Sequence, residues 1–370
     1  MAVIGCGASP DSSSTPNGAA GTAPPFQDDT PSGSEDIPDE MGPAPVEQSP
    51  ATEATVGDIP LQPSTPMMEA PEPAAPVFTG PLPKFVGNIT TGNSVDTNGL
   101  VYSDHWNQIT PENAGKWGSV QATAASAPNY AALDAIYDYT QRKGIIFKEH
   151  TFLWGPQQPS GDVTQANVQS WMQGFCSRYP NTRVIDVVNE PPPHQEPRYA
   201  NAIGGGTNGN WQWIVNAFTW AREACPNAML LLNDYNNVEI ANQNQHFIDI
   251  VKAIQARGAP IDGVGAQGHG LNGANSGRTM IQLLTKLHDD TGLPVFITEY
   301  DINQADDAAQ LARFQEHFTF FLDTEWIRGV TVWGWILGRT WVANSGLIRN
   351  GAPRPAMTWL MQELGRPVPQ

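Results

Sequence analysis

Several features are missing from this sequence, and each absence excludes a class of protein. No apolar run approaches the length needed to span a bilayer, so we expect no transmembrane segment. Nothing suggests the basic face that a nucleic-acid partner would require. No set of His, Cys and carboxylate residues has metal-ligand spacing, and no Gly-rich phosphate loop joins a strand to a helix. We therefore expect neither a metal nor another cofactor.

Residues 1–83 also lack the residue types that build a core. This stretch has no Lys or Arg and only two aromatic residues, but it holds 17 of the 33 prolines and 12 acidic residues. Such a composition cannot bury enough apolar surface to offset the entropy of ordering, so we predict a disordered, acidic, Pro-rich tail or linker. Residues 84–370 then carry a net charge of −6 (−18 minus −12), a low charge density that suits a neutral polymeric ligand.

The chain begins Met-Ala-Val-Ile-Gly-Cys, which is similar to the end of a bacterial lipoprotein signal. A basic region and a longer apolar core would complete such a signal, and neither is present. Two alternatives stay open at this point. Either Cys6 is lipidated and the tail is a tether, or Cys6 is an incidental residue of a disordered terminus.

The remaining 287 residues (370 minus 83) alternate between apolar runs and helical periodicity. This length is close to the roughly 250 residues of a single (β/α)₈ barrel. Near-continuous apolar runs are typical of parallel strands that are buried on both faces. The eight predicted strands are 85–87, 106–110, 145–147, 184–188, 229–232, 263–266, 295–298 and 330–333.

Apolar stripes with a spacing of three and four residues predict helices between these strands. Two of the stripes end near Gly258 and Gly292, which we interpret as helix stops. His317 falls at the edge of a packed stripe and is assigned no function. Strands that alternate with helices predict a (β/α)₈ TIM barrel over residues 84–370. The stripes are Leu133, Ile136, Tyr137, Thr140; Phe247, Ile250, Val251, Ile254; Met280, Leu283, Leu284, Leu287; and Leu311, Phe314, His317, Phe318, Phe321.

Polar and aromatic side chains follow seven of the predicted strands, at the barrel end where active sites lie. Indole faces stack on sugar rings, and amides and carboxylates bind hydroxyls, so this inventory favours a carbohydrate site. Glu190 follows the fourth strand and Glu299 the seventh, and two such carboxylates are the usual equipment for glycoside hydrolysis. Asn-Glu-Pro at 189–191 alone indicates only a turn, but its pairing with Ile-Thr-Glu at 297–299 makes the hypothesis strong.

The motifs occur in the order found in the xylanases of glycoside hydrolase family 10, which residues 84–370 resemble throughout. The matching stretches are ITPENAGKW at 109–117, HTFLW at 150–154, DVVNEP at 186–191, LNDYN at 232–236, QGH at 267–269, ITEYDI at 297–302 and WG at 333–334. The resemblance implies a (β/α)₈ barrel and a retaining endo-β-1,4-xylanase that acts on xylan and xylo-oligosaccharides. Separately, we expect a monomer that is secreted or held at the outer surface, with Cys6 as the candidate lipid anchor.

The resemblance implies a role for each matching residue. Glu190 matches the acid/base, Glu299 the nucleophile and Asn189 the donor to the sugar 2-hydroxyl. His269 matches the histidine bonded to the nucleophile, with Asp301 behind it. The predicted substrate-binding residues are Glu112, Asn113 and Lys116 at the second sugar on the non-reducing side, His150, Trp154 and Gln157 at the adjacent sugar, Gln267 near the acid/base, Trp333 and Trp341 in a lid, and Tyr235 on the leaving-group side.

The chain departs from the family pattern at Gly155, where many members have a histidine, and in its eighth loop, which lacks a common acidic residue. We expect these departures to change sugar affinities but not the reaction. Glu149 should turn from the barrel interior by strand alternation. His194 and Glu196 lie in a Pro-rich loop after the acid/base; they either line the leaving-group side or, as we favour, belong to a solvated loop.

Other readings stay open on sequence alone. The chain could act on β-1,4-glucan if the lid near Trp333, Trp335 and Trp341 leaves room for a hydroxymethyl group. It could bind xylan without catalysis, although the presence of both carboxylates argues against that. A family 5 endoglucanase shares Asn-Glu-Pro but not the Glu-Asn…Lys-Trp block. Cys176 and Cys225 either form a disulfide between neighbouring helices or remain buried free thiols.

Overall fold

The computed structural model describes residues 80–90, 95–97, 99–207 and 209–370. The predictions for residues 1–79, including most of the disordered tail and both alternatives for Cys6, lie outside these residues. The chain from β1 onward folds into a barrel.

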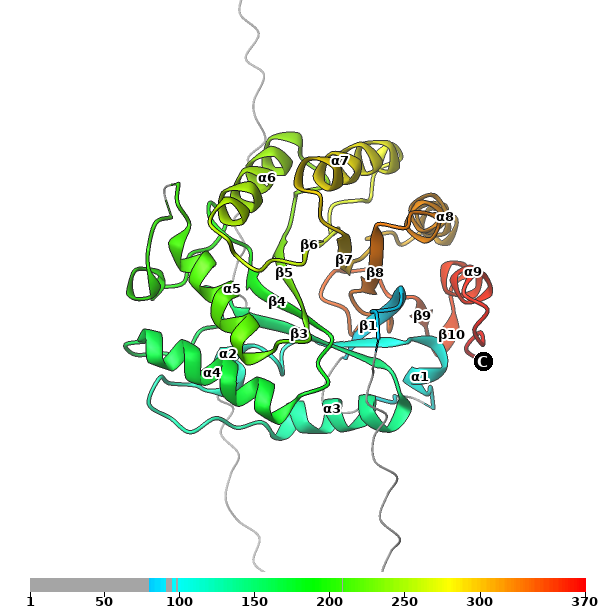
Figure 1. Cartoon of the computed structure of the whole chain (residues 1–370). Helices are drawn as coiled ribbons and strands as arrows, with labels where there is room; N and C mark the ends of the chain where they lie inside the picture. Colours follow the sequence, from blue (N-terminus) through cyan, green and yellow to red (C-terminus); the bar gives the residue numbers. More distant parts are fainter. Residues whose placement is uncertain (1–79, 91–94, 98, 208) are drawn as a thin grey trace, which may run out of the picture. The chain divides into compact units, whose positions relative to one another are not determined.

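Eight parallel strands form that barrel, and they pair in sequence order until β8 closes against β1 (Figure 1). The prediction of a (β/α)₈ barrel is therefore confirmed. The strands are β1 (Phe85–Thr90), β2 (Gln108–Pro111), β3 (Ile146–Leu153), β4 (Val184–Asn189), β5 (Met229–Asp234), β6 (Gly263–Ala266), β7 (Val295–Tyr300) and β8 (Ile327–Val332).

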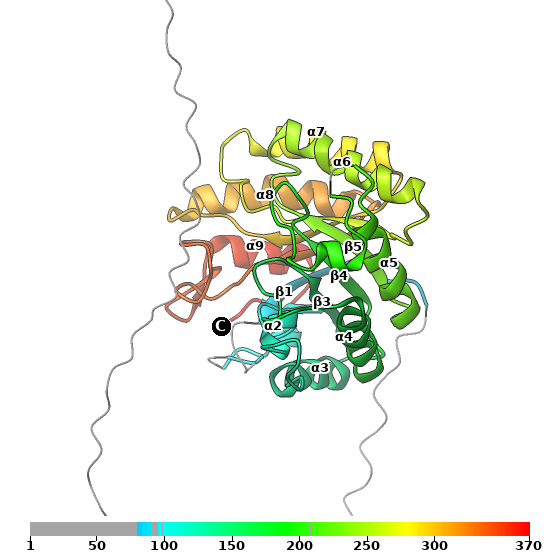
Figure 2. The same ribbon diagram turned by 90° about the vertical axis from the view of Figure 1, so that its left-hand side faces the viewer.

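Helices surround the strands on the outside, as Figures 1 and 2 show from two directions. The four predicted stripes lie on α3, α6, α7 and α8. Gly292, with φ 68°, ends α7, and Gly258, with φ 79°, follows α6, as predicted. The helices are α1 (Tyr102–His105), α2 (Trp117–Val120), α3 (Ala131–Lys143), α4 (Gln165–Arg178), the 3₁₀ helix η1 (Ala200–Ile203), α5 (Gln212–Ala224), α6 (Ala241–Ala256), α7 (Ser276–Thr291), α8 (Asp307–Asp323) and α9 (Pro355–Glu363), and a short hairpin pairs β9 (Ile348–Arg349) with β10 (Ala352–Pro353).

The interior of the barrel changes character along its axis. At the amino ends of the strands, buried apolar side chains form one cluster of Leu82, Phe85, Ile146, Val184, Leu231 and Phe296. We call this set the amino-end plug. Further along the same strands the interior becomes polar, with Lys148, Asp186, Asn233 and Thr298 all fully buried. The apolar runs in the sequence thus conceal a polar layer.

The first and last strands close the barrel. Phe85 lies in register with Gly329, and the pairing continues to Asn88 and Val332. Outside this seam, Lys84 Nζ donates hydrogen bonds of 2.8 Å to the carbonyl oxygens of Leu322 and Thr324. Segments about 240 residues apart are thereby joined.

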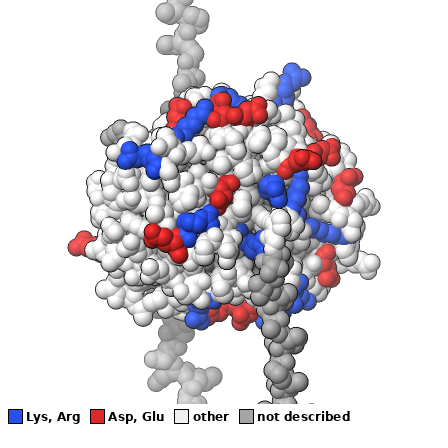
Figure 3. All heavy atoms as spheres, viewed as in Figure 1, with Lys and Arg blue, Asp and Glu red and all other residues white. Residues whose placement is uncertain are grey.

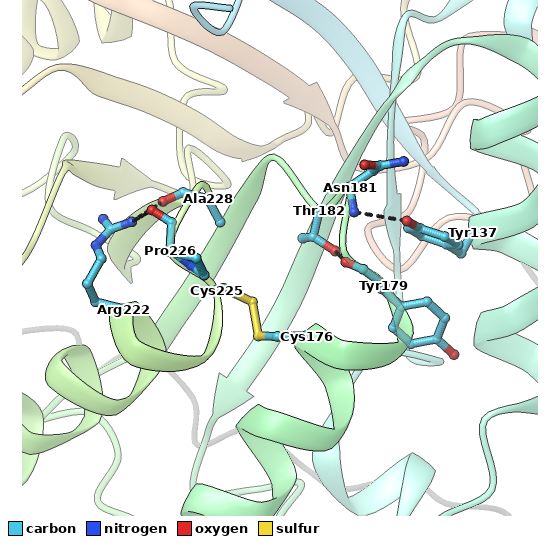
Figure 4. The surroundings of a disulfide bond; sticks show 9 residues. All are labelled: Tyr137, Cys176, Tyr179, Asn181, Thr182, Arg222, Cys225, Pro226 and Ala228. Carbon is cyan, nitrogen blue, oxygen red and sulfur yellow. Dashed lines mark hydrogen bonds between the residues drawn. A yellow bond between two sulfur atoms is a disulfide. The ribbon is translucent and has the colours of Figure 1, made fainter. Parts of the chain in front are cut away.

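A disulfide joins Cys176 in α4 to Cys225, which directly follows α5 (Figure 4). Their Cα atoms are 5.4 Å apart, within the range that the bond requires. Both residues lie where a helix ends before the chain turns into the next strand. The disulfide therefore belongs to the amino end of the barrel, and the alternative of two free thiols is wrong.

Two residues differ from their predicted surroundings. His317 is completely buried, with Nδ1 2.9 Å from the Tyr300 hydroxyl and Nε2 3.2 Å from Ser276 Oγ, so it is a core residue with satisfied nitrogens. Trp335 is only 2% exposed and packs against Tyr102 and Trp106, so it belongs to the core and not to a lid.

The described part of the chain contains no helix that is long and apolar enough to cross a membrane. Within the same residues, no group of three or more His, Cys, Asp or Glu side chains is arranged to hold a metal ion. The face seen in Figure 3 carries basic and acidic side chains interspersed among uncharged ones.

Candidate active site

The predicted site residues lie at the carboxyl ends of the strands or in the loops that follow them. Asn189 is the last residue of β4, Glu299 is the penultimate residue of β7, and Asp301 directly follows β7. Since the strands are parallel, these ends meet at one rim of the barrel. The contacts described below bring the predicted residues together there.

Glu190 is held by the groups around it. Its backbone has a φ of 53°, and its amide donates to the Asn233 carbonyl. Gln267 Nε2 donates to its Oε1 at 3.1 Å, and Trp154 Nε1 donates to its Oε2 at 2.8 Å. Burial raises the pKa of Glu190, and the negative charge of Glu299 raises it further. The hydrogen bonds from Gln267 and Trp154 oppose these two effects, and the net pKa of Glu190 lies above the ordinary carboxyl value.

Glu299 has the opposite environment. Asn233 Nδ2 donates to its Oε1 at 3.0 Å, and His269 Nε2 lies 3.2 Å from its Oε2. Burial alone would raise the pKa of Glu299. The charges of His150 and His269 and the hydrogen bond from His269 outweigh burial and lower that pKa to about 2. Glu299 is therefore ionised at neutral pH, as a nucleophile must be.

His269 connects Glu299 to a second carboxylate. Its Nδ1 lies 2.7 Å from Asp301 Oδ2, so both ring nitrogens face carboxylate oxygens. Burial lowers the pKa of His269, but the charges and hydrogen bonds of Asp301 and Glu299 raise it by more, to about 10. The ring is thus protonated at neutral pH and donates to both carboxylates.

Asn233 bridges the two halves of the site, and the sequence analysis gave it no role. Its Nδ2 lies 2.7 Å from Asn189 Oδ1 as well as 3.0 Å from Glu299. Thr298 Oγ1 donates to its Oδ1 at 2.6 Å and fixes the amide orientation. A Cβ on Gly265 would meet Asn233 Oδ1 at 2.2 Å, so the glycine provides the room. The position of Asn233 within the matched stretch 232–236 was the available signal.

A buried charge network lies beneath His150. The His150 Nδ1 atom is 2.9 Å from Asp186 Oδ2 and 4.0 Å from Glu299 Oε1. Lys148 Nζ bonds the same Asp186 oxygen, and both side chains are completely buried. Alternation along β3 turns Lys148 and His150 to the same side, which the spacing of two residues could have indicated.

The residues predicted for the non-reducing side gather around Lys116. Its Nζ donates to Asn113 Oδ1 at 3.0 Å and lies 4.6 Å from the ring centroid of Trp154. Burial lowers the pKa of Lys116, against the charges of Glu299, Glu112 and Glu190. Gln157 Oε1 accepts a hydrogen bond from Ser119 Oγ at 3.1 Å. A cavity of about 290 Å³ adjoins this group and is lined in part by Glu112 and Asn113.

Two tryptophans from the loop after β8 cover the histidines. The Trp333 ring is 5.3 Å from that of His150, and the Trp341 ring is 4.8 Å from that of His269. Trp333 is 4% exposed, whereas Trp341 is 55% exposed. Trp333 therefore belongs to the wall of the site and Trp341 to its outer edge, while Trp335 is absent from both.

The contacts of His194 contradict the favoured interpretation of a solvated loop. Its Nδ1 lies 2.7 Å from Asp234 Oδ1, and its ring stacks on Tyr235 at a centroid distance of 3.9 Å. His194 is therefore part of an ordered contact and not of a solvated loop. Glu196 is exposed, as expected. Burial raises the pKa of Asp234 to about 7, against the hydrogen bond from His194.

Glu149 and Gly155 lie next to the site without a catalytic contact of their own. Glu149 turns from the barrel interior as expected, and its carboxyl group lies against Gly115, completely buried. Burial raises the pKa of Glu149 well above its ordinary value. A Cβ on Gly155 would lie 3.3 Å from the Glu196 carbonyl oxygen and 3.5 Å from the Gln195 side chain. The space of the missing histidine is therefore bordered by the loop that follows Glu190.

A carboxyl group with a raised pKa and an ionised carboxylate share one hydrogen-bonded site, surrounded by amides and indoles at the carboxyl end of a (β/α)₈ barrel. This combination defines the class of glycoside hydrolases. The model of glycosyl hydrolase family 10 matches residues 83–363, and the chain belongs to that family.

Curated proteins and solved structures with similar sequences or folds include several xylanases. Endo-1,4-beta-xylanase B of Cellvibrio japonicus is 43% identical over 286 residues, which are 75% of this chain and 45% of that protein. Endo-1,4-beta-xylanase C of Phanerodontia chrysosporium is 29% identical over 288 residues, 71% of each chain. The chain thus spans less than half the length of the Cellvibrio relative. Xylanase 10B of Thermotoga petrophila, solved with xylobiose, shares the fold with a TM-score of 0.66 at 23% identity, covering 76% of this chain and 94% of that one.

Proposed function

We propose that the chain is an endo-β-1,4-xylanase that hydrolyses internal bonds of xylan with retention of configuration. Its family and the names of its xylanase relatives support this substrate class. The observation that carries the proposal is the pair Glu190 and Glu299, whose pKa values are displaced in opposite directions within one network. Such a separation assigns acid and base roles to two otherwise equal carboxyl groups.

In the first step, a Glu299 oxygen attacks the anomeric carbon while Glu190 gives its proton to the glycosidic oxygen. The bond between that oxygen and the anomeric carbon breaks, and the leaving chain departs with a new hydroxyl group. The product is a glycosyl ester on Glu299. His269 and Asn233 hold the two Glu299 oxygens and thereby orient the nucleophile.

In the second step, Glu190 is ionised and takes a proton from water. The water oxygen attacks the anomeric carbon from the face that the leaving group vacated, and Glu299 is released as a carboxylate. Two inversions give net retention. Asn189 Nδ2 lies 3.2 Å from Glu190 Oε1, which places an amide donor beside the acid for the sugar 2-hydroxyl.

The test is a product profile for the purified chain on linear xylo-oligosaccharides, arabinoxylan and carboxymethylcellulose. We expect internal cleavage of the xylose polymers, with the β-anomer formed first in proton NMR. Cleavage of carboxymethylcellulose without cleavage of the xylose polymers would show that the substrate is a β-1,4-glucan and not xylan. Binding of xylan without release of reducing sugar would leave a non-catalytic xylan-binding protein.

We also propose that the protein is exported and acts as a monomer. The disulfide between Cys176 and Cys225 supports export, because such bonds persist in oxidising compartments. Fractionation of the producing cells and light scattering of the purified chain test the two statements separately. Protein confined to the reducing interior, or a stable dimer, would contradict them.

A further inference from the structure

His194 is fixed at both edges of its ring. Nδ1 lies 2.7 Å from Asp234 Oδ1, and Nε2 lies 2.9 Å from Gln243 Oε1. These partners come from the end of β5 and from the first turn of α6, while His194 itself belongs to the loop after β4. Three separate elements therefore determine the position of one imidazole ring.

This fixed ring supports Tyr235. The two rings are stacked, with centroids 3.9 Å apart and planes inclined by 16°. Hydrogen bonds to a carboxyl oxygen at Nδ1 and to an amide oxygen at Nε2 hold both edges of the His194 ring. Burial lowers the pKa of His194, but the hydrogen bond and charge of Asp234 raise it by more.

The stack lies on the leaving-group side of Glu190. Tyr235 directly follows β5. Glu112 and Lys116 follow β2, and the strands β3 and β4 lie between β2 and β5. The negative charge of Glu190 contributes to raising the pKa of Tyr235, so the two side chains are electrostatic neighbours. His194 covers one face of the tyrosine ring, and the Tyr235 side chain is still partly exposed.

We propose that His194 is a positioning residue that holds Tyr235 as the platform for the first sugar on the leaving-group side. This inference rests on the proposed function and deepens it. The platform acts when a sugar occupies that side, both as a leaving group and as an acceptor of the glycosyl group. It has no part in the attack of water on the glycosyl ester, where the leaving-group side is empty.

The test measures how the glycosyl ester divides between water and an added acceptor. An activated aryl xylobioside forms the ester, and xylobiose is added as the acceptor. In His194→Ala we expect the ratio of transfer to hydrolysis to fall about 3- to 10-fold, the value of one aromatic contact. The rate of ester hydrolysis without acceptor should stay within about twofold of the wild type, because water needs no platform.

Two further variants separate positioning from loss of fold. Gln243→Leu removes one edge bond at a distance from the reacting atoms and should lower the ratio in the same direction. Asn242→Leu changes the adjacent, exposed residue and should leave the ratio unchanged. His194→Phe keeps a stacking ring without the edge bonds and should give an intermediate ratio. Thermal unfolding confirms that each variant is folded.

An unchanged ratio in both His194→Ala and Gln243→Leu would overturn the inference. An equal fall in acceptor transfer and in ester hydrolysis would also overturn it, because His194 would then act on the whole site. If the wild type releases no aryl group and no reducing sugar, the proposed function itself fails, and that failure is visible before any variant is compared.

Discussion

The two ends of the barrel interior are equally buried but have different chemistry. At the amino end, the plug of apolar side chains includes Phe85 and Phe296, whose rings are 6.1 Å apart. Toward the carboxyl end, the same strands bury Lys148, Asp186 and Glu299. Burial of apolar surface stabilises a fold, whereas burial of charges stabilises it only if they are paired and hydrogen-bonded. The comparison therefore assigns stability to one end and chemistry to the other.

The largest effect should follow from changes to Glu190 and Glu299, the two carboxylates that we propose as catalytic. We expect Glu299→Ala to lower kcat on xylan on the order of 10⁴-fold or more, because no nucleophile remains. Azide can then attack only from the vacated face, so an activated aryl xylobioside should give the α-glycosyl azide. Glu190→Ala should also lose xylan cleavage, yet the aryl substrate should still form the glycosyl ester.

The products identify which carboxylate has which role. In Glu190→Ala, azide should release the accumulated ester as the β-glycosyl azide, and proton NMR distinguishes the anomers. An α-azide from Glu190→Ala, or an α-anomer as the first wild-type product, would reverse the assignment. Thermal unfolding should show that both variants are folded, since the apolar amino end is untouched.

A change in the amino-end plug should give the opposite result. We expect Phe296→Ala to lower the free energy of unfolding by about 3–5 kcal/mol through the cavity that it leaves. Where the variant is folded, kcat/KM should equal that of the wild type. Denaturant unfolding and xylan kinetics on the same sample measure both quantities. Phe320→Ala, on the half-buried outer face of α8, is the matched control and should cost less.

The disulfide also belongs to the amino end of the barrel, so its removal is a second test of whether stability and activity are separate. The bond closes a segment with a sequence separation of 49 residues. Replacing both Cys176 and Cys225 by Ser should lower the free energy of unfolding by about 2–4 kcal/mol, chiefly by freeing the unfolded chain. Activity at moderate temperature should not change. A fall in kcat with unchanged stability would show that the two ends are not independent.

The pH dependence of kcat/KM tests the ionisable groups at the carboxyl end of the barrel. Glu299 has a pKa of about 2, so its ionisation should be lost only as the pH falls toward that value. His269→Gln removes a positive charge and leaves burial in place, so the pKa of Glu299 should rise. The acidic limb of kcat/KM should then begin at higher pH, while the basic limb set by Glu190 stays above the ordinary carboxyl range. An unmoved acidic limb would show that His269 does not hold the nucleophile ionised.

The smallest effect should come from Gly155→His. The new side chain meets the Glu196 carbonyl oxygen at 3.3 Å from its Cβ, so the neighbouring loop must shift by a few tenths of an ångström. We expect kcat/KM on xylo-oligosaccharides to change by less than about fivefold, the range of one modest contact. A large gain on every oligosaccharide would show that the glycine is a defect of this site.

The sequence predicted the barrel because each strand carries a recognisable apolar run. It did not reveal the polar layer, because Lys148 and Asp186 interrupt such runs without any local sign of their partners. Their bond joins residues 38 apart, and the contact of Asn233 with Glu299 spans 66. Such pairs depend on the register between strands, which no single strand encodes.

The candidate site was predicted where the motifs were continuous and missed where a residue acts through another loop. The roles of Glu190 and Glu299 follow from short stretches, and the structure places fitting partners around both. His194 belongs to a Pro-rich loop whose composition suggests exposure, and only the approach of Asp234 and Gln243 makes it ordered. The prediction placed Trp335 near the lid, whereas the residue lies in the core. The sequence cannot distinguish the two, because tryptophan occurs in both settings.

The pairing of β1 with β8 has a consequence for how the chain is made. β1 emerges early from the ribosome, but one of its two edges finds its partner only when Gly329 and its neighbours have followed. Contacts of such long sequence separation slow folding, and an unpaired parallel edge exposes backbone groups in the meantime. The nascent protein therefore has an open sheet for most of its synthesis. Its barrel closes late, and a chain that ends before β8 should remain open and prone to aggregate.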